Sequence, residues 1–314
     1  MNKLYILLAT YNGNKYIAEQ LDSLLCQTYT DFHILISDDG SNDSTVSIIN
    51  HYCETYKKIK LLPPKNKKMG VCGNFEYLLE NADDADYIMF CDQDDIWQPD
   101  KVLLAMASMK KEETLHTNQT PILVYSNMQY VSSDLTSISY LSICVEQKNK
   151  PTLLVQNYIY GCTMLLNKCL YLLLLPISKN ADNHDAWTSL VACMTGKIVY
   201  IPDKTILYRQ HDSNASGNVK NSSFKKRFQR NILNIKTERG FLHKRLNMLK
   251  DACEFLKNKP HNQYYLLACE FLQKLSLSKY SAINFMLKNK ILMLTKLQTL
   301  KLFFLILTDS FGKK

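Results

Sequence analysis

The sequence lacks the motifs that mark several common classes of binding protein and enzyme. Its ten cysteines form no closely spaced doublets of the kind that hold zinc. No G-x-G-x-x-G follows a strand-like run and no G-x-x-x-x-G-K-[ST] occurs, which argues against a dinucleotide-dependent dehydrogenase and against a phosphate-binding loop. There is also no internal repeat and no low-complexity linker.

Long hydrophobic runs are missing as well. A membrane-spanning helix needs about 18 apolar residues, and the longest runs, Leu170–Leu175 and Leu302–Leu307, are far shorter. The run Leu4–Ala9 is too short for the core of a signal peptide and continues into Tyr11 without a small-residue cleavage pattern. We therefore expect a buried first strand at Leu4–Ala9, a chain that does not span a membrane, and a cytoplasmic protein with reduced thiols.

Charge is divided unevenly along the chain, whose formal net charge is +9. Residues 216–314 contain 20 Lys and Arg against 5 Asp and Glu, a net charge of +15. Residues 1–215 contain 18 basic and 24 acidic side chains, a net charge of −6. This division predicts two parts with different tasks, an acidic domain at 1–215 and a basic region at 216–314, with a hinge in Asp212–Ser223.

Short apolar runs alternate with helix-like segments over the first 110 residues, and the alternation loosens from about residue 120. Asp43 or Ser44 can cap the second helix, and Pro99 suits the first turn of a helix through Val102. The alternation predicts an α/β fold with a mostly parallel central sheet covered by helices. Strands are expected at Leu4–Ala9, Phe32–Ser37, Ile59–Leu62, Tyr87–Cys91, Ile122–Tyr125, Cys162–Leu166 and Ile198–Ile201.

Beyond Gly217 the apolar spacing is helical throughout and predicts an all-helical C-terminal region. Basic amphipathic helices dock on anionic lipid, so we expect this region to bind an anionic membrane surface. The alternative is that its apolar stripes pack against the first domain and leave a solvated basic face. The stripes are Phe224, Phe228, Ile232 and Ile235; Leu242, Leu246, Leu249, Cys253 and Leu256; and Ile283, Leu287, Ile291 and Leu294.

Polar residues follow the first two predicted strands, with Thr10-Tyr11-Asn12 after the first and the segment SDDGS at 37–41 after the second. In parallel sheets, ligands bind at the carboxyl ends of the strands. A carboxylate there can accept the N3–H of a uracil or thymine ring, and an aromatic side chain can stack on the ring. The alternative is that Asp38 and Asp39 belong only to a turn and a helix cap, which Asp, Gly and Ser also favour.

An acidic cluster, DQDD at 92–95, follows the strand-like run Tyr87–Cys91. Three carboxylates within four residues repel one another, so their crowding favours a bound cation. Asp92 and Asp94 can share a divalent ion, Mn²⁺ or Mg²⁺, whose other positions are filled by diphosphate oxygens and water. A solvated acidic turn is the alternative, but it explains poorly why the carboxylates lie at a strand end beside Trp97.

Taken together, TYNG, then SDDGSNDST, then a DxDD followed by Trp97 and Pro99 resemble the family 2 glycosyltransferases with the GT-A fold, over about residues 3–215. The segments GCTM at 161–164, HDAW at 184–187 and YRQH at 208–211 are similar to a bacterial rhamnosyltransferase-like branch. The resemblance implies that Asp39 contacts the base, that Asp92 and Asp94 form the metal–diphosphate motif, and that Asp185 is the catalytic base.

Elementary chemistry supports these roles. Displacement at an anomeric carbon needs a base for the proton of the acceptor hydroxyl and an electrophile that holds the leaving diphosphate. Asp185 is expected at the start of a helix, where the helix dipole favours its anionic form and where it could also be a cap. His211 can complete the metal shell as a neutral imidazole or be structural, and Arg209 can contact phosphate.

Asn66, Gly70 and Asn74 match a further family segment. Gly70 can let the backbone approach the donor, and Asn74 can bond a sugar hydroxyl or simply a loop carbonyl. The expected metal ligands are Asp92, Asp94 and His211. The expected donor-binding residues are Thr10, Tyr11, Asn12, Asp39, Gly70, Asn74, Asp92, Gln93 and Arg209.

We therefore predict an inverting glycosyltransferase that moves a sugar from a UDP- or dTDP-sugar, with dTDP-rhamnose favoured by the branch, to a glycan or lipid-linked glycan in bacterial cell-surface polysaccharide synthesis. It is expected at the inner face of the cell membrane as a peripheral protein. The alternative, a catalytically inactive nucleotide- or glycan-binding module of the same fold, is disfavoured because Asp94 and Asp185 are both present. Nucleic-acid binding ranks last, since no nucleic-acid motif accompanies the basic region.

Overall fold

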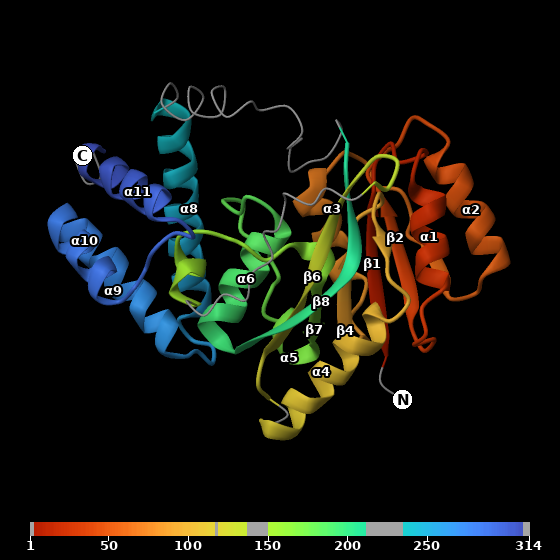
Figure 1. Ribbon diagram of the computed structural model, residues 1–314, viewed down its shortest axis with the longest axis horizontal. Helices are drawn as coiled ribbons and strands as arrows, with labels where there is room; N and C mark the ends of the chain where they lie inside the picture. Colours follow the sequence, from red (N-terminus) through yellow and green to blue (C-terminus); the bar gives the residue numbers. More distant parts are fainter. Residues whose placement is uncertain (1–2, 117–118, 137–149, 212–234, 310–314) are drawn as a thin grey trace.

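A central eight-stranded sheet organises the structure, a computed structural model that describes residues 3–116, 119–136, 150–211 and 235–309 (Figure 1). The strand order is β3-β2-β1-β4-β7-β6-β8-β5. Strands β3, β2, β1 and β4 are parallel to one another, and β7 is antiparallel to β4 and β6. The strands are β1 (Leu4–Thr10), β2 (His33–Asp38), β3 (Ile59–Leu61), β4 (Tyr87–Cys91), β5 (Ile96–Trp97), β6 (Ile122–Ser132), β7 (Met164–Asn167) and β8 (Lys197–Gln210).

Helices cover both faces of this sheet because successive strand residues point to opposite sides. On β1, Ile6 and Leu8 belong to one hydrophobic cluster with α1, α2 and α4, whereas Leu7 belongs to the other cluster with α3 and α6. The predicted α/β class, with its sheet between helices, is confirmed. The helices before residue 211 are α1 (Ile17–Leu25), α2 (Thr45–Thr55), α3 (Gly70–Glu80), α4 (Lys101–Leu115), α5 (Lys168–Tyr171) and α6 (His184–Thr195), with 3₁₀ turns η1 (Lys150–Leu154) and η2 (Gly161–Thr163).

Several boundaries differ from the prediction. β6 is longer than expected, and β8 runs through Pro202 and joins two segments that look separate in the sequence. β7 begins at Met164, since Cys162 lies in η2. Pro99 precedes α4 instead of lying in its first turn, because the helix begins at Lys101.

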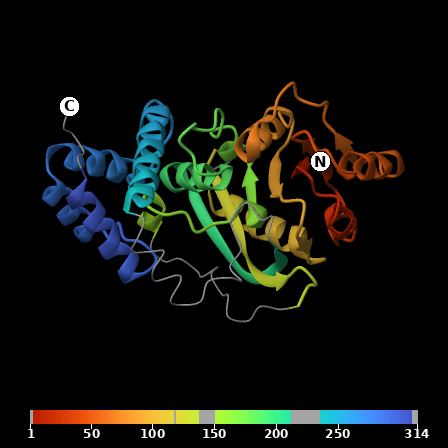
Figure 2. The ribbon, with the colours of Figure 1, turned by 90° about the horizontal axis from the view of Figure 1, so that it is seen from above.

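The described part of the C-terminal region, residues 235–309, contains four helices: α8 (Ile235–Leu256), α9 (Gln263–Leu277), α10 (Lys279–Lys288) and α11 (Lys296–Thr308). They lie at the end of the molecule opposite α1 and α2 (Figure 2). The predicted stripe of α8 is largely buried and shares one hydrophobic cluster with Leu7 and Phe75 of the sheet domain. None of the helices in the described ranges is both long enough and apolar enough to cross a membrane.

The third predicted stripe is wrong. α10 ends at Lys288 and buries Ala282 and Met286, while Leu287 is 54% exposed. Ile291 is buried, but it follows the helix and so cannot extend a helical stripe. Three further predictions lie outside the described residues. They are the first stripe through Ile232, the hinge at 212–223 and the domain boundary between residues 215 and 216.

Side chains of α8 fasten the loop that leads into α6. Asp251 accepts hydrogen bonds from the Ser178 hydroxyl (2.5 Å) and the Asn180 amide (2.9 Å). Lys244 forms an ion pair with Asp182 (3.4 Å). The C-terminal region therefore positions a segment of the sheet domain that ends just before Asp185.

Candidate active site

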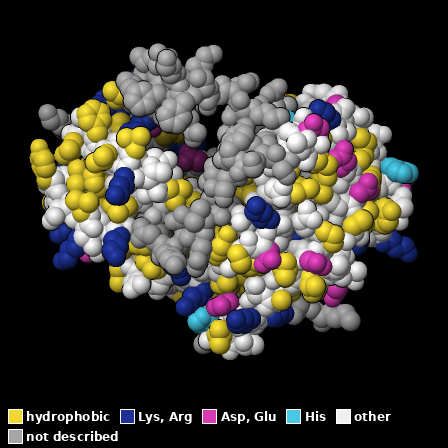
Figure 3. Space-filling model, viewed as in Figure 1, with side chains coloured by type: hydrophobic (Ala, Val, Ile, Leu, Met, Phe, Trp, Pro, Cys, Tyr) yellow, Lys and Arg dark blue, Asp and Glu magenta, His cyan; other side chains and the backbone are white. Residues whose placement is uncertain are grey.

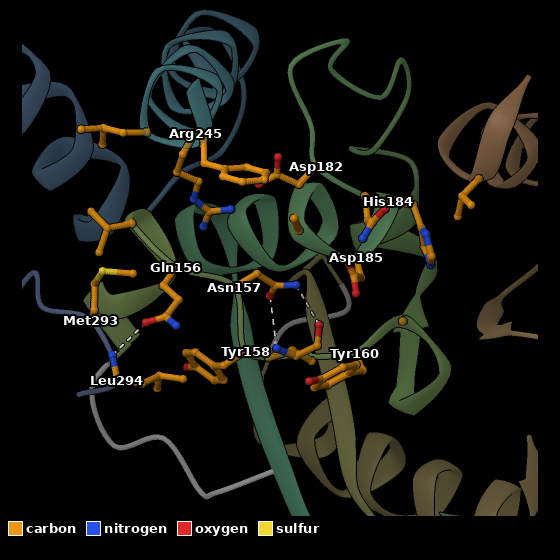
Figure 4. Close-up of a pocket in the computed structure, with 18 of the residues that line it drawn as sticks. Gln156, Asn157, Tyr158, Tyr160, Asp182, His184, Asp185, Arg245, Met293 and Leu294 are labelled. Carbon is orange, nitrogen blue, oxygen red and sulfur yellow. Dashed lines mark hydrogen bonds between the residues drawn. The ribbon is translucent and has the colours of Figure 1, made fainter. Parts of the chain in front are cut away.

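A large cavity of about 1590 Å³ lies where the ends of the parallel strands meet the C-terminal helices. Its lining includes residues that follow β1, β2 and β4, the first turns of α3 and α6, and residues of α8 and α11 (Figure 4). It thus combines the expected carboxyl-end site of the sheet with a wall from the C-terminal region. The predicted residues on this lining are Thr10, Tyr11, Asp39, Gly70, Asn74, Asp92, Gln93, Asp94 and Asp185.

Asp38 and Asp39 have different roles. The carboxylate of Asp38 accepts hydrogen bonds from the hydroxyl groups of Thr10 (2.9 Å) and Ser41 (2.6 Å). It also accepts the backbone N–H groups of Gly40 (3.0 Å) and Ser41 (2.7 Å). Asp38 therefore holds the turn, as the alternative interpretation expected, whereas Asp39 lines the cavity.

Asp39 is bound by the start of α3. Its two oxygens accept the backbone N–H groups of Met69 and Gly70, each at 2.8 Å, and Lys65 Nζ lies 3.6 Å away. Gly70 has a φ of 69°, a conformation that favours glycine. A carboxylate offers about four acceptor positions, so Asp39 can still accept an N–H group from a ligand in the cavity.

Tyr11 and Gln93 join the loops after β1 and β4. Gln93 Oε1 accepts the Tyr11 N–H (2.9 Å), and Gln93 Nε2 donates to the Tyr11 carbonyl (3.0 Å). A Cβ on Gly13 would lie 2.2 Å from Gln93 Oε1, so any other residue there would displace the Gln93 side chain and its hydrogen bonds to Tyr11. Tyr11 is 42% exposed, and Lys68 Nζ lies over one face of its ring, 4.2 Å from the centroid, so a planar ligand could stack only on the other face.

The carboxylates of the acidic cluster at 92–95 are crowded, and burial and mutual repulsion disfavour their charged forms. Burial raises the pKa of Asp92 to about 7, and the charges of Asp94 and Asp185 act in the same direction. Burial and the charges of Asp94 and Asp92 raise the pKa of Asp95, whose Oδ2 accepts no hydrogen bond within the described part of the chain. Ligand atoms of Asp92, Asp95 and Cys162 lie within 4.8 Å of one another. Such crowding suits a bound cation.

Asp94 and His211, two of the predicted metal ligands, lie in contact, but neither belongs to the group formed by Asp92, Asp95 and Cys162. His211 Nε2 lies 2.8 Å from Asp94 Oδ2, although 117 residues separate them. Arg209 has a different place: its Nε donates to the Asp94 carbonyl (2.9 Å) and its Nη2 pairs with Glu19 (2.6 Å). Because Arg209 is buried and does not line the cavity, the structure assigns it a supporting role behind the Asp94 turn, and the predicted phosphate contact has no geometric support.

Two asparagines from the predicted donor set are engaged by the protein. Asn12 Oδ1 accepts the backbone N–H of Asn42 (2.9 Å), and Asn12 does not line the cavity. Asn74 Nδ2 donates to the Ser37 carbonyl (2.9 Å), and its Oδ1 accepts a hydrogen bond from Lys65. Both hold the ends of β1 and β2 in place, which for Asn74 matches the loop-carbonyl alternative.

Asp185 lies in the first turn of α6 and faces the cavity. Burial raises its pKa to about 6, against the lowering effect of the backbone N–H groups of Ala186 and Gly161 and of the Arg245 charge. The helix start therefore favours the anion, as expected, but burial is the stronger influence. A carboxylate with a pKa near 6 is well suited to accept a proton at neutral pH.

Two lining residues were not singled out from the sequence. His184 is buried between Phe75 and Phe90, and burial lowers its pKa to about 3, so it is neutral. Arg245 extends from α8 into the cavity (Figure 4). No local motif marks Arg245, since it sits in an ordinary amphipathic helix 60 residues beyond Asp185.

The fold and this cavity define a GT-A type transferase that uses nucleotide-sugar donors. Residues 5–171 match the family described as Glycosyl transferase family 2, and the chain belongs to this family. It is 32% identical over 276 residues to the dTDP-rhamnosyl transferase RfbG of Shigella flexneri, a match that covers 82% of this chain and 89% of that protein. The predicted glycosyltransferase and its rhamnosyltransferase-like branch are confirmed, and the protein is an enzyme, not an inactive module.

Solved structures share the fold at low sequence identity. The crystal structure of S. aureus TarS 1–349 in complex with UDP-GlcNAc matches with a TM-score of 0.57 and 15% identity, over 91% of this chain and 80% of that chain. The mannosyltransferase PcManGT from Pyrobaculum calidifontis, in complex with GDP-Man and Mn²⁺, matches with a TM-score of 0.50 and 15% identity, over 99% and 88% of the two chains.

Proposed function

We propose that this glycosyltransferase inverts the anomeric centre and transfers a sugar from a dTDP- or UDP-sugar, with dTDP-rhamnose as the first candidate, to a glycan acceptor of the bacterial cell surface. The observation that carries this proposal is that one cavity contains both the strand-end carboxylates Asp39, Asp92 and Asp94 and the isolated carboxylate Asp185. The similarity to a dTDP-rhamnosyl transferase favours that donor.

In the donor half, Asp39 would accept the N3–H of uracil or thymine while the Tyr11 ring stacks on the base. These two bases present the same N3–H edge, so both nucleotides fit. Gly70 allows the backbone to approach the nucleotide because it has no side chain. The remaining predicted donor residues would act indirectly by holding the loops: Thr10 and Asn12 at the β1 end, Asn74 at the start of α3, Gln93 against Tyr11, and Arg209 behind Asp94.

A divalent cation fits the acidic cluster. Oxygen-rich, crowded carboxylates with raised pKa values are stabilised by a hard cation such as Mn²⁺ or Mg²⁺. Asp92 and Asp94 would hold it, with His211 in reach of Asp94 (2.8 Å). The cation supplies the positive charge that a leaving diphosphate requires.

On the acceptor side, Asp185 would act as the base. The acceptor oxygen forms a bond to the anomeric carbon, the bond from that carbon to the diphosphate oxygen breaks, and the acceptor proton passes to a carboxylate oxygen of Asp185. Attack from the side opposite the leaving group inverts the configuration. The raised pKa of Asp185, about 6, supports this role, because a stronger base takes the proton more readily.

The C-terminal helices would place the enzyme on an anionic membrane surface, at the cytoplasmic face, where a lipid-linked acceptor is accessible. Hydrophobic side chains gather over the end of the molecule formed by these helices (Figure 3). On α9 and α10, Leu277, Tyr280 and Leu287 are 74%, 78% and 54% exposed and do not line the cavity. An apolar surface among Lys and Arg side chains suits binding to anionic headgroups.

The proposal is tested by measuring release of nucleoside diphosphate from UDP-, dTDP- and GDP-sugars with Mn²⁺, with Mg²⁺ and with EDTA. We expect metal-dependent release from a dTDP- or UDP-sugar and little from GDP-sugars. Asp94→Asn should reduce the rate by about 100-fold or more, because the diphosphate loses its main contact through the metal. NMR of the sugar released into water should show the inverted anomer first.

Asp203→Asn is the matched control, since Asp203 is an exposed carboxylate on β8 that does not line the cavity. It should leave the rate unchanged. Release that is undiminished in EDTA would contradict the metal site, and a retained anomeric configuration would contradict the inverting mechanism.

A further inference from the structure

The cavity is larger than a nucleotide sugar requires. Ligand pockets commonly measure about 300–1,000 Å³, whereas this one measures about 1590 Å³. Its donor half lies at the strand ends, and the other half is walled by α8, α11 and residues 155–160. The second half is therefore the place for the acceptor, if the donor half is used as proposed above.

Arg245 lies on the acceptor side of Asp185. Arg245 belongs to α8, which walls the second half of the cavity, and it lies close enough to Asp185 for the two charges to interact. Figure 4 shows the Arg245 side chain reaching from α8 into the cavity, with Asp182 and Asp185 to one side and Gln156 to the other. A group bound by Arg245 would thus be next to the accepting hydroxyl and away from the donor diphosphate.

The guanidinium of Arg245 is buried and incompletely paired. The residue is only 7% exposed, and burial lowers its pKa to about 10. Its Nη2 donates to the Leu153 carbonyl, but its Nε has no hydrogen-bond partner among the residues that the structure describes. Within the same residues no carboxylate lies in ion-pair contact with it, and Asp182 instead pairs with Lys244 (3.4 Å).

Burying a charge without a close counter-ion is strongly unfavourable. Such a cation in a cavity wall indicates a site that an anion completes. Guanidinium groups bind phosphate and carboxylate oxygens through two parallel N–H donors. The Nε of Arg245 has almost no exposed surface, so the pair that faces the cavity would be Nη1 and the second N–H of Nη2.

We propose that Arg245 is an acceptor-specificity residue that binds an oxyanion, a phosphate or a carboxylate, carried by the sugar that receives the transferred residue. This inference rests on the proposed use of the donor half and of Asp185. In this proposal the C-terminal region takes part in acceptor recognition. Arg245 of α8 binds the charged group of the acceptor, and the sheet domain binds the nucleotide.

The test is a titration of the enzyme, with its donor half saturated by Mn²⁺ and dTDP or UDP, with three probes: glucose 1-phosphate, glucuronate and uncharged glucose. Affinity is followed by NMR or calorimetry. We expect at least one charged probe to bind about tenfold or more tightly than glucose. Comparing glucose 1-phosphate with glucuronate shows whether the site prefers a phosphate or a carboxylate.

Arg245→Met should remove this preference while nucleotide affinity stays the same, and Arg245→Lys should retain part of it. Lys250→Met is the matched control, because it removes one positive charge from an exposed position of the same helix that does not line the cavity. It should keep the preference for charged probes. Thermal melting reports whether each variant is folded.

Equal affinity of the wild-type enzyme for glucose and both charged probes would overturn the proposal. So would an unchanged preference in folded Arg245→Met. If Arg245→Met only moved the acid limb of donor hydrolysis to higher pH and left probe binding intact, Arg245 would merely support Asp185, and the proposal would be wrong. Failure of dTDP and UDP to bind the wild-type enzyme would instead count against the proposed function, independently of Arg245.

Discussion

At the scale of single residues, opposing influences set the pKa of Asp185. Backbone N–H groups and Arg245 lower its pKa, but burial raises it to about 6. The base form therefore exists above pH 6 and is lost as the pH falls below 6. We expect kcat/KM for donor hydrolysis to fall about tenfold per pH unit below pH 6, because the deprotonated fraction falls by that factor.

Asp185→Asn keeps the shape of this side chain but cannot take up a proton in the same way. It should lower turnover by about 100-fold or more at pH 7.5, abolish the acid limb, and leave donor affinity unchanged. Calorimetry with dTDP or UDP measures that affinity. Loss of nucleotide binding together with activity would move Asp185 into the donor half.

The sequence located part of this site because its motifs follow apolar runs, and strand ends converge in a parallel sheet. Asp39, Asp92, Asp94 and Asp185, all predicted site residues, line one cavity, and their roles stay predictions. The sequence could not tell which polar residues face the ligand and which face the protein, since Asp38 and Asp39 have the same local chemistry. Arg245 was missed because its role depends on tertiary packing of a distant helix.

At the scale of elements, the strands near the N-terminus were predictable because each is a short apolar run between helical segments. β8 was not, because Pro202 and the polar residues after it interrupt its pattern. Register shifts between β6 and β8 at Asn127 accommodate this stretch without ending the strand. The ends of α10 were misjudged for a related reason: apolar residues that follow the helix continue its spacing.

Because α8 packs on the sheet domain, we expect the two parts of the chain to unfold together. Leu249 is fully buried in the cluster that also contains Leu7 and Phe75. Leu249→Ala should destabilise the whole chain by about 2–5 kcal/mol, because it opens a cavity in a shared core. Thermal unfolding should retain a single transition at a lower midpoint.

Leu266→Ala on α9 is the control, since Leu266 is 60% exposed and its loss should change stability by no more than about 0.5 kcal/mol. Two separate transitions, with only one shifted by Leu249→Ala, would show that 216–314 folds as an independent unit. In that case the predicted division at residue 215 would also be a boundary of folding.

At the scale of the whole molecule, charge and exposed apolar side chains coincide in the C-terminal region. We expect the protein to float with vesicles that contain anionic phospholipid at low salt and to be released at high salt, because headgroup attraction is screened. Leu277→Ser combined with Leu287→Ser, at exposed positions of α9 and α10 that do not line the cavity, should weaken this binding. Leu115→Ser, at an equally exposed position at the end of α4, should not.

Absence of flotation with anionic vesicles at low salt would contradict membrane docking. The same result in neutral and anionic vesicles would show that the basic residues contribute nothing. The apolar stripe of α8 packs inward, as the alternative interpretation expected. Membrane docking therefore depends on the exposed apolar side chains of α9 and α10.

Because Asp251 and Lys244 of α8 fasten the loop before α6, the catalytic unit extends beyond the segment that matches the family. The recognisable family segment ends at residue 171, before the base and before every residue of α8. A chain cut after residue 215 would keep each nucleotide motif and still lose the anchors of Ser178, Asn180 and Asp182. Such a fragment would carry the family signature without a fixed base, and exchanging the C-terminal helices between relatives would exchange acceptor preference while the donor stayed the same.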